Sequence, residues 1–191
     1  MRITGGLLTG RQVKVPEGGN ISEIRPSMDK MRESVFASLG DLTGLSFLDL
    51  FCGTGIIALE AASRGASYLE AVEADPNKRK TLLENVKISP VRINCRFMSA
   101  ELYIKRAKRS FNIIFCDPPF PYAYKWQLVN MIASSKLMEN GSLLIIHHPR
   151  EENNNILLDS LIKKDMRKFG RSVVDFYEFS FLGNGDITEN S

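Results

Sequence analysis

The sequence predicts an α/β protein in which helices cover both faces of one mostly parallel, seven-stranded sheet. From Ser46 onward, five short apolar runs alternate with helical stretches, and such repeated strand–helix units with short connections give a doubly wound sheet. Several runs are apolar with little alternation, as in strands that are buried on both faces. Two further strand-like segments close the chain, and we expect them to form a hairpin at one edge. The runs are residues 47–50, 68–72, 92–97, 112–116 and 142–146, and the closing pair is 166–169 and 173–180.

The segments between the apolar runs carry helical patterns. Pro26 and Ser27 are suitable residues for a helix start, and Met31 and Val35 then fall on one face of the helix that follows. Asp75-Pro76 predicts another helix start, because proline is favoured at the first helical position. Further helices are expected at residues 56–63, 100–107, 126–134 and 155–164.

Three parts of the chain differ in composition. Residues 1–26 are rich in glycine and contain short alternating apolar stretches, which predict a small β-hairpin extension. Residues 27–182 form the main domain, including its leading helix. Residues 183–191 are polar and are expected to form a flexible tail.

The overall composition excludes several classes of protein. Of the 191 residues, 43% are hydrophobic and 25% are charged, which is too apolar for intrinsic disorder. No apolar run approaches the roughly 20 residues that span a bilayer, and the first residues lack the apolar core of a signal peptide. Cys52, Cys95 and Cys116 are too few and too scattered for a disulfide framework. We therefore expect a cytoplasmic protein, not a membrane, secreted or fibrous one.

A glycine-rich turn follows the first apolar run. Gly53, Gly55 and Ala58 fit the pattern G-x-G-x-x-A, in which glycine lets the chain turn sharply and approach a ligand without a Cβ clash. Glu73 ends the second run twenty residues after Gly53, where a carboxylate can accept both hydroxyls of a ribose. The pattern predicts a cofactor site. Further members of this site are expected to be Asp49, Thr54, Ala74 and, after the fourth run, Asp117.

Two cofactors fit this pattern, a nicotinamide dinucleotide and S-adenosylmethionine. A dinucleotide needs room for a second nucleotide and usually a separate substrate domain, which this chain lacks. S-adenosylmethionine has a single ribose, so backbone amides near Gly53 and Gly55 are free to bind its carboxylate. Asp49 is expected either to orient the loop or to reach the methionine amino group. S-adenosylmethionine is therefore the predicted cofactor.

The tetrapeptide Asp117-Pro118-Pro119-Phe120 follows the fourth apolar run directly. Prolines cannot continue a ladder, and they stiffen the chain at the carboxyl edge of the sheet, where α/β proteins bind ligands. The Asp117 carboxylate and the Pro118 carbonyl can accept both hydrogens of an exocyclic amine, and Phe120 can stack on the base that carries it. Asp117, Pro118 and Phe120 are the predicted catalytic residues. Pro119 and Tyr122 are expected near the substrate base, although Tyr122 also fits core packing.

This arrangement suits the methylation of a poorly nucleophilic amine. Two acceptors orient the nitrogen, favour its pyramidal form and stabilise the positive charge that develops on it. The methylated product is strongly acidic, so Asp117 or a water can take its proton late and no strong base is needed.

The sequence resembles the RsmD-type rRNA methyltransferases over nearly its whole length. The resemblance rests on R-I-x-G-G from Arg2, R-P-S-x-D-x-x-R-E-x-x-F from Arg25, D-L-F-C-G-T-G from Asp49, E-A-x-S-R-G-A from Glu60 and D-P-P-F from Asp117. It implies a Rossmann-like class I methyltransferase fold. It also implies that S-adenosylmethionine methylates N2 of a guanine in the 16S rRNA of the small ribosomal subunit.

The resemblance also assigns roles to individual residues. The stretch that begins at Arg25 and includes Arg32 helps to enclose the cofactor and the substrate base. At the end of the third apolar run the family often has an acidic or amide residue that meets the adenine amino group. Here Ser99 and Ala100 occupy that position, so the adenine contact would come from the Ser99 hydroxyl or from nearby backbone groups.

Basic residues are concentrated in one part of the chain. Residues 78–109 hold ten basic side chains and two acidic ones, a local charge of +8 in a chain whose total is +3. This asymmetry fits either a surface for a polyanion or ordinary solvated helix faces. The candidates for RNA contact are Lys105, Arg106, Lys108 and Arg109.

Other interpretations of the chain remain open. It could methylate adenine or cytosine in DNA, or a protein glutamine, or it could be a catalytically inactive RNA-binding factor in ribosome assembly. A nicotinamide oxidoreductase gives no role to D-P-P-F. His147 and His148 are adjacent on a strand and therefore point to opposite faces, so we expect no metal site. We read Cys52 and Cys116 as small buried residues and expect a monomer.

Overall fold

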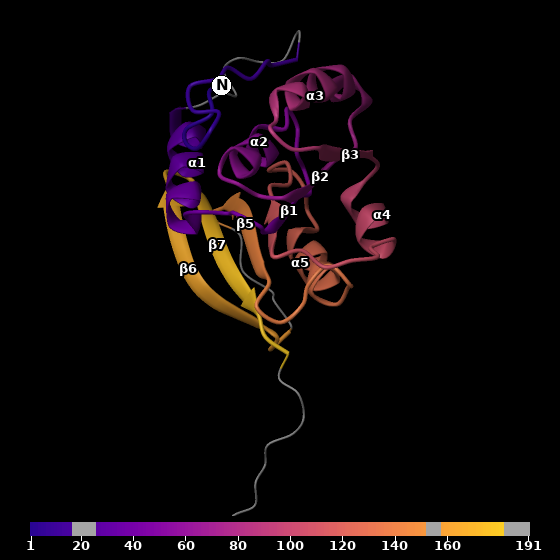
Figure 1. The fold of residues 1–191 in the computed structure, drawn as a ribbon. Coiled ribbons are helices and arrows are strands. Elements are labelled where there is room, and N and C mark those ends of the chain that lie inside the picture. Colours follow the sequence, from indigo (N-terminus) through magenta and orange to yellow (C-terminus); the bar gives the residue numbers. More distant parts are fainter. Residues whose placement is uncertain (17–25, 152–157, 182–191) are drawn as a thin grey trace, which may run out of the picture.

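The computed structural model describes residues 1–16, 26–151 and 158–181 and contains the predicted seven-stranded sheet (Figure 1). The strand order is β3-β2-β1-β4-β5-β7-β6. Strands β1 to β5 pair in parallel, whereas β7 is antiparallel to both β5 and β6. The strands are β1 (Ser46–Asp49), β2 (Tyr68–Glu73), β3 (Ile93–Phe97), β4 (Ile113–Cys116), β5 (Leu143–Pro149), β6 (Leu161–Phe169) and β7 (Ser172–Phe179).

Helices cover both faces of the sheet, as predicted (Figure 1). Residues of α1, α2 and α3 share one apolar cluster with side chains such as Phe115 of β4, and residues of α4 and α5 share a second cluster with Ile114. Successive side chains of β4 therefore pack into two different apolar clusters, which explains why this strand is apolar throughout. The helices are α1 (Pro26–Leu39), α2 (Ile56–Ser63), α3 (Arg79–Asn85), α4 (Ala100–Lys105) and α5 (Lys125–Ala133), with 3₁₀ turns at η2 (Pro76–Lys78) and η3 (Val86–Ile88).

The direction of chain growth reverses between β1 and β4, which are neighbours in the sheet. From β1 the chain builds β2 and β3 on one side and then β4 and β5 on the other. Ligands of such sheets bind at the carboxyl ends of the strands beside this reversal. The ends of β1 and β4 therefore mark where a functional site is expected.

The described part of the N-terminal segment, residues 1–16, reverses direction and forms one β-bridge, between Arg2 and Gln12, and no ladder. It packs against α2: the Leu7 N–H donates to the Ser63 carbonyl at 2.7 Å. A Cβ on Gly6, whose φ is +75°, would lie 1.9 Å from that carbonyl oxygen, so only glycine fits. Residues 1–16 thus share the core of the main domain.

The helix predicted over residues 155–164 is wrong in its second half. Residues 152–157 lie outside the described part of the chain, and Leu161 begins strand β6. Leu161 is buried, whereas Lys163 and Lys164 reach across to Asp175 and Glu178 of β7 at 2.8 and 3.2 Å. These pairs come from tertiary contacts, which the local apolar spacing does not reveal. No helix among the described residues is both long and apolar enough to cross a bilayer.

Candidate active site

The glycine-rich turn after β1 has one open side and one closely packed side. Gly53 and Gly55 have φ values of +54° and +82°, in the left-handed region that favours glycine. A Cβ on Gly53 would meet nothing within 4 Å, whereas one on Gly55 would lie 2.7 Å from Leu82 Cδ1 of α3. The open side at Gly53 leaves room beside the turn, where the sequence predicts a ligand.

Glu73 connects this turn to the end of β2. Its Oε2 accepts the Gly53 N–H and its Oε1 accepts the Asp75 N–H, both at 2.8 Å. A carboxylate has about four acceptor positions, so Glu73 retains capacity for further donors. Its contact with a ribose stays a prediction, but its role in shaping the glycine turn is visible in these bonds.

Asp49, at the end of β1, is fully buried without a matching donor. Neither carboxylate oxygen makes a hydrogen bond of normal geometry with a described residue. Burial raises the pKa of Asp49 well above its usual range, the negative charges of Asp117 and Glu73 raise it further, and backbone N–H groups at Ala58 and Phe51 oppose this only in part. Buried acceptors in proteins are normally satisfied, so the Asp49 carboxylate has capacity for a further donor.

Hydrogen bonds hold the second half of the turn from Asp117 to Tyr122. The Tyr122 N–H donates to the Pro119 carbonyl at 2.8 Å. The ammonium group of Lys125, a side chain that is 1% exposed, donates to the Phe120 and Tyr122 carbonyls at 2.7 and 2.8 Å. Phe120 itself remains 47% exposed, as expected of a ring that is free to stack on a ligand. No local pattern around Lys125 predicts that its ammonium group holds this turn from the buried side.

His147 of β5 lies directly beside Asp117, a neighbour that the sequence analysis missed. Its Nδ1 is 2.8 Å from Asp117 Oδ1, and its ring centroid is 5.5 Å from that of Phe120. His148 points to the other face, where it meets Asp175 at 3.3 Å and the Trp126 ring. The predicted divergence of the two histidines is therefore correct. The structure shows no group of three potential metal ligands among its described residues.

Strand register explains why these groups converge. Asp49 pairs with Ala71 of β2 and Phe115 of β4, so Glu73 and Asp117 each lie two residues beyond a partner of Asp49. Side chains two apart on a strand share a face. Asp49, Glu73, Asp117 and His147 therefore gather on one face of the sheet edge, on four adjacent strands or their ends.

Ser99 and Ala100, the residues predicted to meet the adenine, take part in local contacts of α4. The Ser99 hydroxyl accepts the Leu102 N–H at 3.3 Å and caps α4, and Ala100 is buried behind it. The Tyr122 hydroxyl donates to the Glu101 carboxylate. Burial and this carboxylate raise the pKa of Tyr122, and the same bond lowers the pKa of Glu101. Tyr122 thus links the D-P-P-F turn to α4, and a hydrogen bond from the Ser99 side chain also lowers the pKa of Glu101.

Arg32 is buried in a network of hydrogen bonds with other parts of the protein. Its side chain is 4% exposed, and its Nε donates to Glu60 Oε1 at 2.8 Å. Its other nitrogens donate to Asp29 and to the Arg2 carbonyl. The geometry therefore gives Arg32 a structural role, and the other arginine of that prediction, Arg25, lies outside the described residues.

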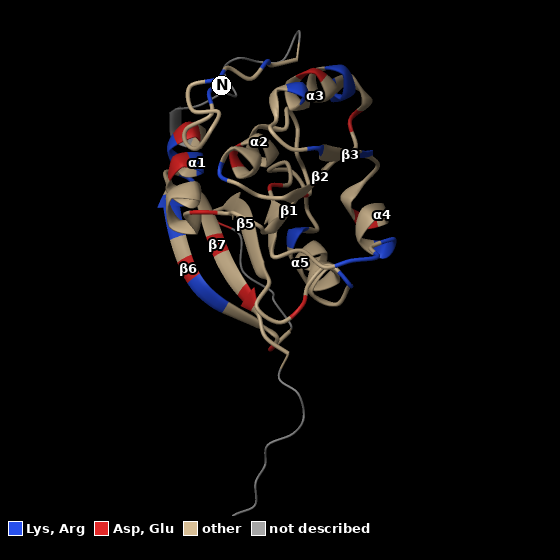
Figure 2. Ribbon diagram, viewed as in Figure 1, with Lys and Arg blue, Asp and Glu red and all other residues tan. Residues whose placement is uncertain are grey.

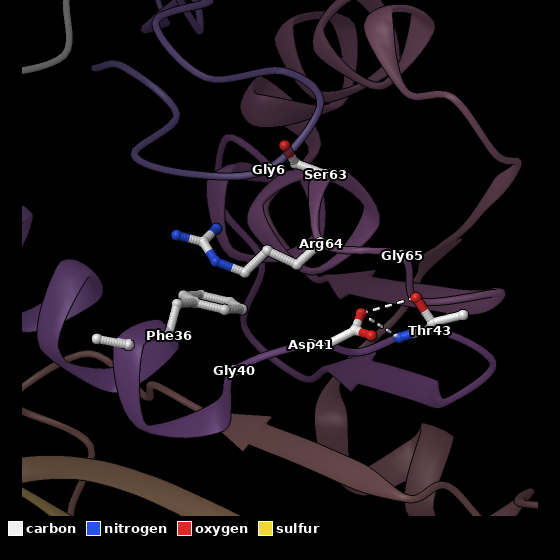
Figure 3. A pocket seen from close by; sticks show the side chains of 9 residues that line it. Gly6, Phe36, Gly40, Asp41, Thr43, Ser63, Arg64 and Gly65 are labelled. Carbon is white, nitrogen blue, oxygen red and sulfur yellow. Dashed lines mark hydrogen bonds between the residues drawn. The ribbon is translucent and has the colours of Figure 1, made fainter.

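A separate pocket opens beside Arg64, whose guanidinium lies 4.8 Å from the centre of the Phe36 ring (Figure 3). Its wall includes Asp41 and Thr43, which precede β1, and Gly65, which precedes β2. It therefore lies at the amino edge of the parallel strands. Because Asp49 and Asp117 lie at the carboxyl edge, this pocket is not part of the candidate active site.

The predicted RNA-contact residues lie at that same amino edge. Figure 2 shows basic residues at the end of α4, from which the chain leads into the start of β4. All four side chains are exposed, and the Arg109 guanidinium stacks 3.7 Å from the centre of the Tyr68 ring. Asp117 follows the other end of β4, so these residues do not border the candidate active site. They are Lys105, Arg106, Lys108 and Arg109.

Other exposed basic residues occupy the carboxyl edge. Arg79 and Lys80 begin α3, which follows β2 and the short η2 turn, and Figure 2 shows basic residues on this helix. Arg150 and Arg171 follow β5 and precede β7, and the Arg150 N–H donates to the Arg171 carbonyl at 3.0 Å. These cations share the sheet edge with Asp117.

Comparison with known proteins gives one consistent pattern. The family described as "Conserved hypothetical protein 95" matches residues 1–178. The "Putative rRNA methyltransferase YlbH" of Bacillus subtilis is 28% identical over 189 residues, covering 93% of this chain and 98% of that protein. The "Ribosomal RNA small subunit methyltransferase D" of Escherichia coli is 29% identical, covering 76% and 73%. The solved structure "Putative methyltransferase yhhF from Escherichia coli" has a TM-score of 0.80 at 25% identity, covering 94% and 98%.

Proposed function

The chain belongs to the family described as Conserved hypothetical protein 95, and from this membership and the site geometry we propose that it methylates N2 of a guanine in small-subunit 16S rRNA. The methyl donor in this proposal is S-adenosylmethionine, and the substrate is an assembled or partly assembled subunit. The observation that carries the proposal is the rigid D-P-P-F turn, with Asp117 aimed from the end of β4 into a site that also holds the unsatisfied carboxylate of Asp49.

The residues around the glycine turn fit S-adenosylmethionine. Both carboxylate oxygens of Asp49 are buried without a hydrogen bond of normal geometry to any described residue, and the ammonium group of a methionine moiety would satisfy them. The open side of Gly53 leaves its surroundings free for that ligand, and Glu73 retains acceptor capacity for ribose hydroxyls. When bound, this cofactor supplies a methyl group on a sulfonium, which reacts with an amine without a covalent enzyme intermediate.

The catalytic work of the chain is mainly positioning. The Asp117 carboxylate and the Pro118 carbonyl accept the two N–H groups of the exocyclic amine, which orients its lone pair. Phe120 stacks on the base. The negative charge of Asp117 stabilises the positive charge that grows on the nitrogen. Proton loss from the product follows, to Asp117 or to water.

The choice of rRNA guanine over other planar amines rests on relatives. The Escherichia coli relative is named as a small-subunit rRNA methyltransferase, and the Bacillus subtilis relative is named for rRNA as well. Exposed basic residues at the carboxyl edge, such as Arg150 and Arg171, would meet the phosphates that surround a base inserted beside Asp117.

The proposal predicts one labelled product. The protein is incubated with methyl-labelled S-adenosylmethionine and either naked 16S rRNA or small subunits that lack the modification, and the digested RNA is analysed for labelled nucleosides. We expect N2-methylguanosine, formed more readily on subunits. Asp117→Ala should bind the cofactor normally but turn over about 10²-fold more slowly, because it lacks one preorganised site group.

Each competing reaction gives a distinct result in the same assay. Label in N6-methyladenosine or in a ribosomal protein would overturn the choice of substrate. Normal subunit binding without any label would favour a non-catalytic assembly factor. Equal losses of cofactor affinity and turnover in Asp117→Ala would contradict the role given to Asp117.

A further inference from the structure

His147 is a buried histidine in direct contact with Asp117, and the reaction proposed above gives it no role. Ile146 pairs with Cys116 in the parallel register of β5 and β4, so His147 and Asp117 are the next neighbours and project to the same face. The Nδ1 of His147 lies 2.8 Å from Asp117 Oδ1. Within the described part of the chain, no other hydrogen bond reaches the Asp117 carboxylate.

The surroundings of the imidazole determine which nitrogen carries the proton. A carboxylate only accepts, so the Nδ1 that faces it must donate. The Nε2 of His147 is buried and has no partner among the described residues. A proton on Nε2 would therefore be a buried donor without an acceptor, which is costly. The favoured form donates from Nδ1 and leaves Nε2 bare.

The contact fixes one oxygen of Asp117 and leaves the other available. The side chain of His147 is 5% exposed, whereas that of Asp117 is 24% exposed. The ring of Phe120 lies beside the imidazole at 5.5 Å and limits its movement. A carboxylate that is anchored through Oδ1 can present Oδ2 in one orientation instead of rotating among several rotamers.

We propose that His147 is a positioning residue that holds Asp117 through the Nδ1–Oδ1 hydrogen bond, so that Oδ2 is presented to the amine of the substrate base. This inference rests on the proposed function, in which Asp117 and the Pro118 carbonyl must accept two hydrogens of one amine together. Such paired recognition is sensitive to geometry, because a displacement of about 1 Å at a reacting centre can cost ~10²-fold in rate. Loss of the hydrogen bond that anchors Asp117 should therefore lower kcat by a measurable factor.

The test compares side chains that place a donor at different points. Asparagine can put an amide donor near the position of Nδ1, whereas glutamine reaches toward Nε2 and leucine has no donor. We expect His147→Leu and His147→Gln to lower kcat about tenfold or more while KM for S-adenosylmethionine stays within twofold. His147→Asn should recover most of the loss. His148→Asn is the matched control on the opposite face of the same strand, and it should retain the wild-type kcat.

A double-mutant cycle separates positioning from a general structural effect. If His147 acts through Asp117, His147→Leu should cause no further loss of kcat in the Asp117→Ala background. Additive losses in the double variant, or equal kcat values for His147→Asn and His147→Leu, would overturn the inference.

A spectroscopic measurement tests the contact without any turnover. The ¹⁵N chemical shifts of the His147 ring should report a proton on Nδ1 in the wild type, and this preference should weaken in Asp117→Ala. A proton found on Nε2 alone in the wild type would overturn the inference even if the enzyme is active. Absence of methyl transfer by the wild type, together with the expected shifts, would instead reject the proposed function and leave the contact standing.

Discussion

Asp49 is a buried carboxylate whose surroundings oppose its charge. Burial, followed by the nearby charges of Asp117 and Glu73, raises its pKa in the folded protein. Between the unfolded pKa of about 3.9 and the higher folded value, the folded state binds a proton that the unfolded state has lost. The contribution of Asp49 to stability therefore decreases as pH rises through this window and stays unfavourable above it.

Asp49→Asn should stabilise the ligand-free fold at neutral pH. We expect its free energy of unfolding at pH 7.5 to increase by about 1 kcal/mol or more, because a buried charge without a partner is removed. The gain should shrink as the pH approaches 4, where wild-type Asp49 becomes protonated. Urea unfolding across this pH range measures the effect, and a gain that is independent of pH would contradict the explanation.

Asp41 provides a control of opposite sign. The Thr43 hydroxyl, with a smaller contribution from the Thr43 N–H, lowers the pKa of this exposed carboxylate. Its stabilising contribution is therefore present above the unfolded pKa and is lost as the pH falls through the folded one. Asp41→Asn should not stabilise the protein at pH 7.5.

Cofactor binding gives a second test of Asp49. If Asp49 binds S-adenosylmethionine, adding this cofactor should raise the Tm of the wild type more than that of Asp49→Asn.

The two edges of the sheet carry different sets of basic residues, and the parallel connections decide which set faces the site. Helix α4 starts at the carboxyl edge and ends at the amino edge, so the cations of its C-terminal end are carried away from Asp117. Helix α3 begins at the carboxyl edge, and its first residues stay close to it. Charge counted along the sequence does not distinguish these two positions.

We expect the carboxyl-edge cations to contribute more to RNA binding than those of the amino edge. A triple variant, Lys80→Gln with Arg150→Gln and Arg171→Gln, should weaken binding and reduce the slope of log affinity against log salt by about 0.7–0.9 for each lost phosphate contact. The matched control changes Lys105, Arg106 and Lys108 to Gln and removes the same charge. A larger slope change in the control would mean that the RNA extends over the amino edge.

The strands were predictable where burial alone determines them. The runs around Phe47 and Ile114 are apolar on both faces, and this pattern predicts strands that are buried on both faces. Strand β6 differs, because only Leu161 of its first four residues is buried and the others are exposed. Its pairing with β7 depends on partners such as Asp175 and Glu178, which no local pattern around residue 161 contains.

The N-terminal segment is joined to the rest of the molecule by a buried ionic network. Glu60 of α2 is fully buried and binds the guanidinium groups of Arg32 and Arg64 as well as the Thr4 N–H. Arg32 also donates to the Arg2 carbonyl at 2.7 Å. Helix α2, which follows the glycine turn, is thus held in place by Thr4, Arg32 and Arg64, which come from three separate parts of the chain.

Arg32→Ala should destabilise the whole molecule. Removing one partner of a buried ion pair leaves charge poorly compensated, at a cost of roughly 3 kcal/mol. Urea unfolding measures this loss, and limited trypsin digestion should cut faster at Arg11. Lys30→Ala changes an exposed residue of the same helix and should have little effect. Normal stability with a selective loss of substrate binding would restore the predicted substrate role of Arg32.

The main parts of the candidate site could be predicted because they follow strands in a fixed order. Asp49, Glu73 and Asp117 each stand at or directly after the end of an apolar run, and parallel strands bring such ends to one edge. The contact of His147 with Asp117 and that of Arg32 with Glu60 could not be predicted, because the partners lie 30 and 28 residues apart in the sequence. Such pairings require the register of strands and the packing of helices.

The attachment of the first residues to α2 affects the order in which the protein can fold during synthesis. Thr4 and Leu8 bind Glu60 and Ser63, which are made 56 and 55 residues later. The central strand β1 likewise needs β4, whose Ile113 pairs with Phe47. A nascent chain therefore leaves the ribosome with its N-terminal segment unpaired, and the carboxylates of the site come together only after most of the chain has been translated.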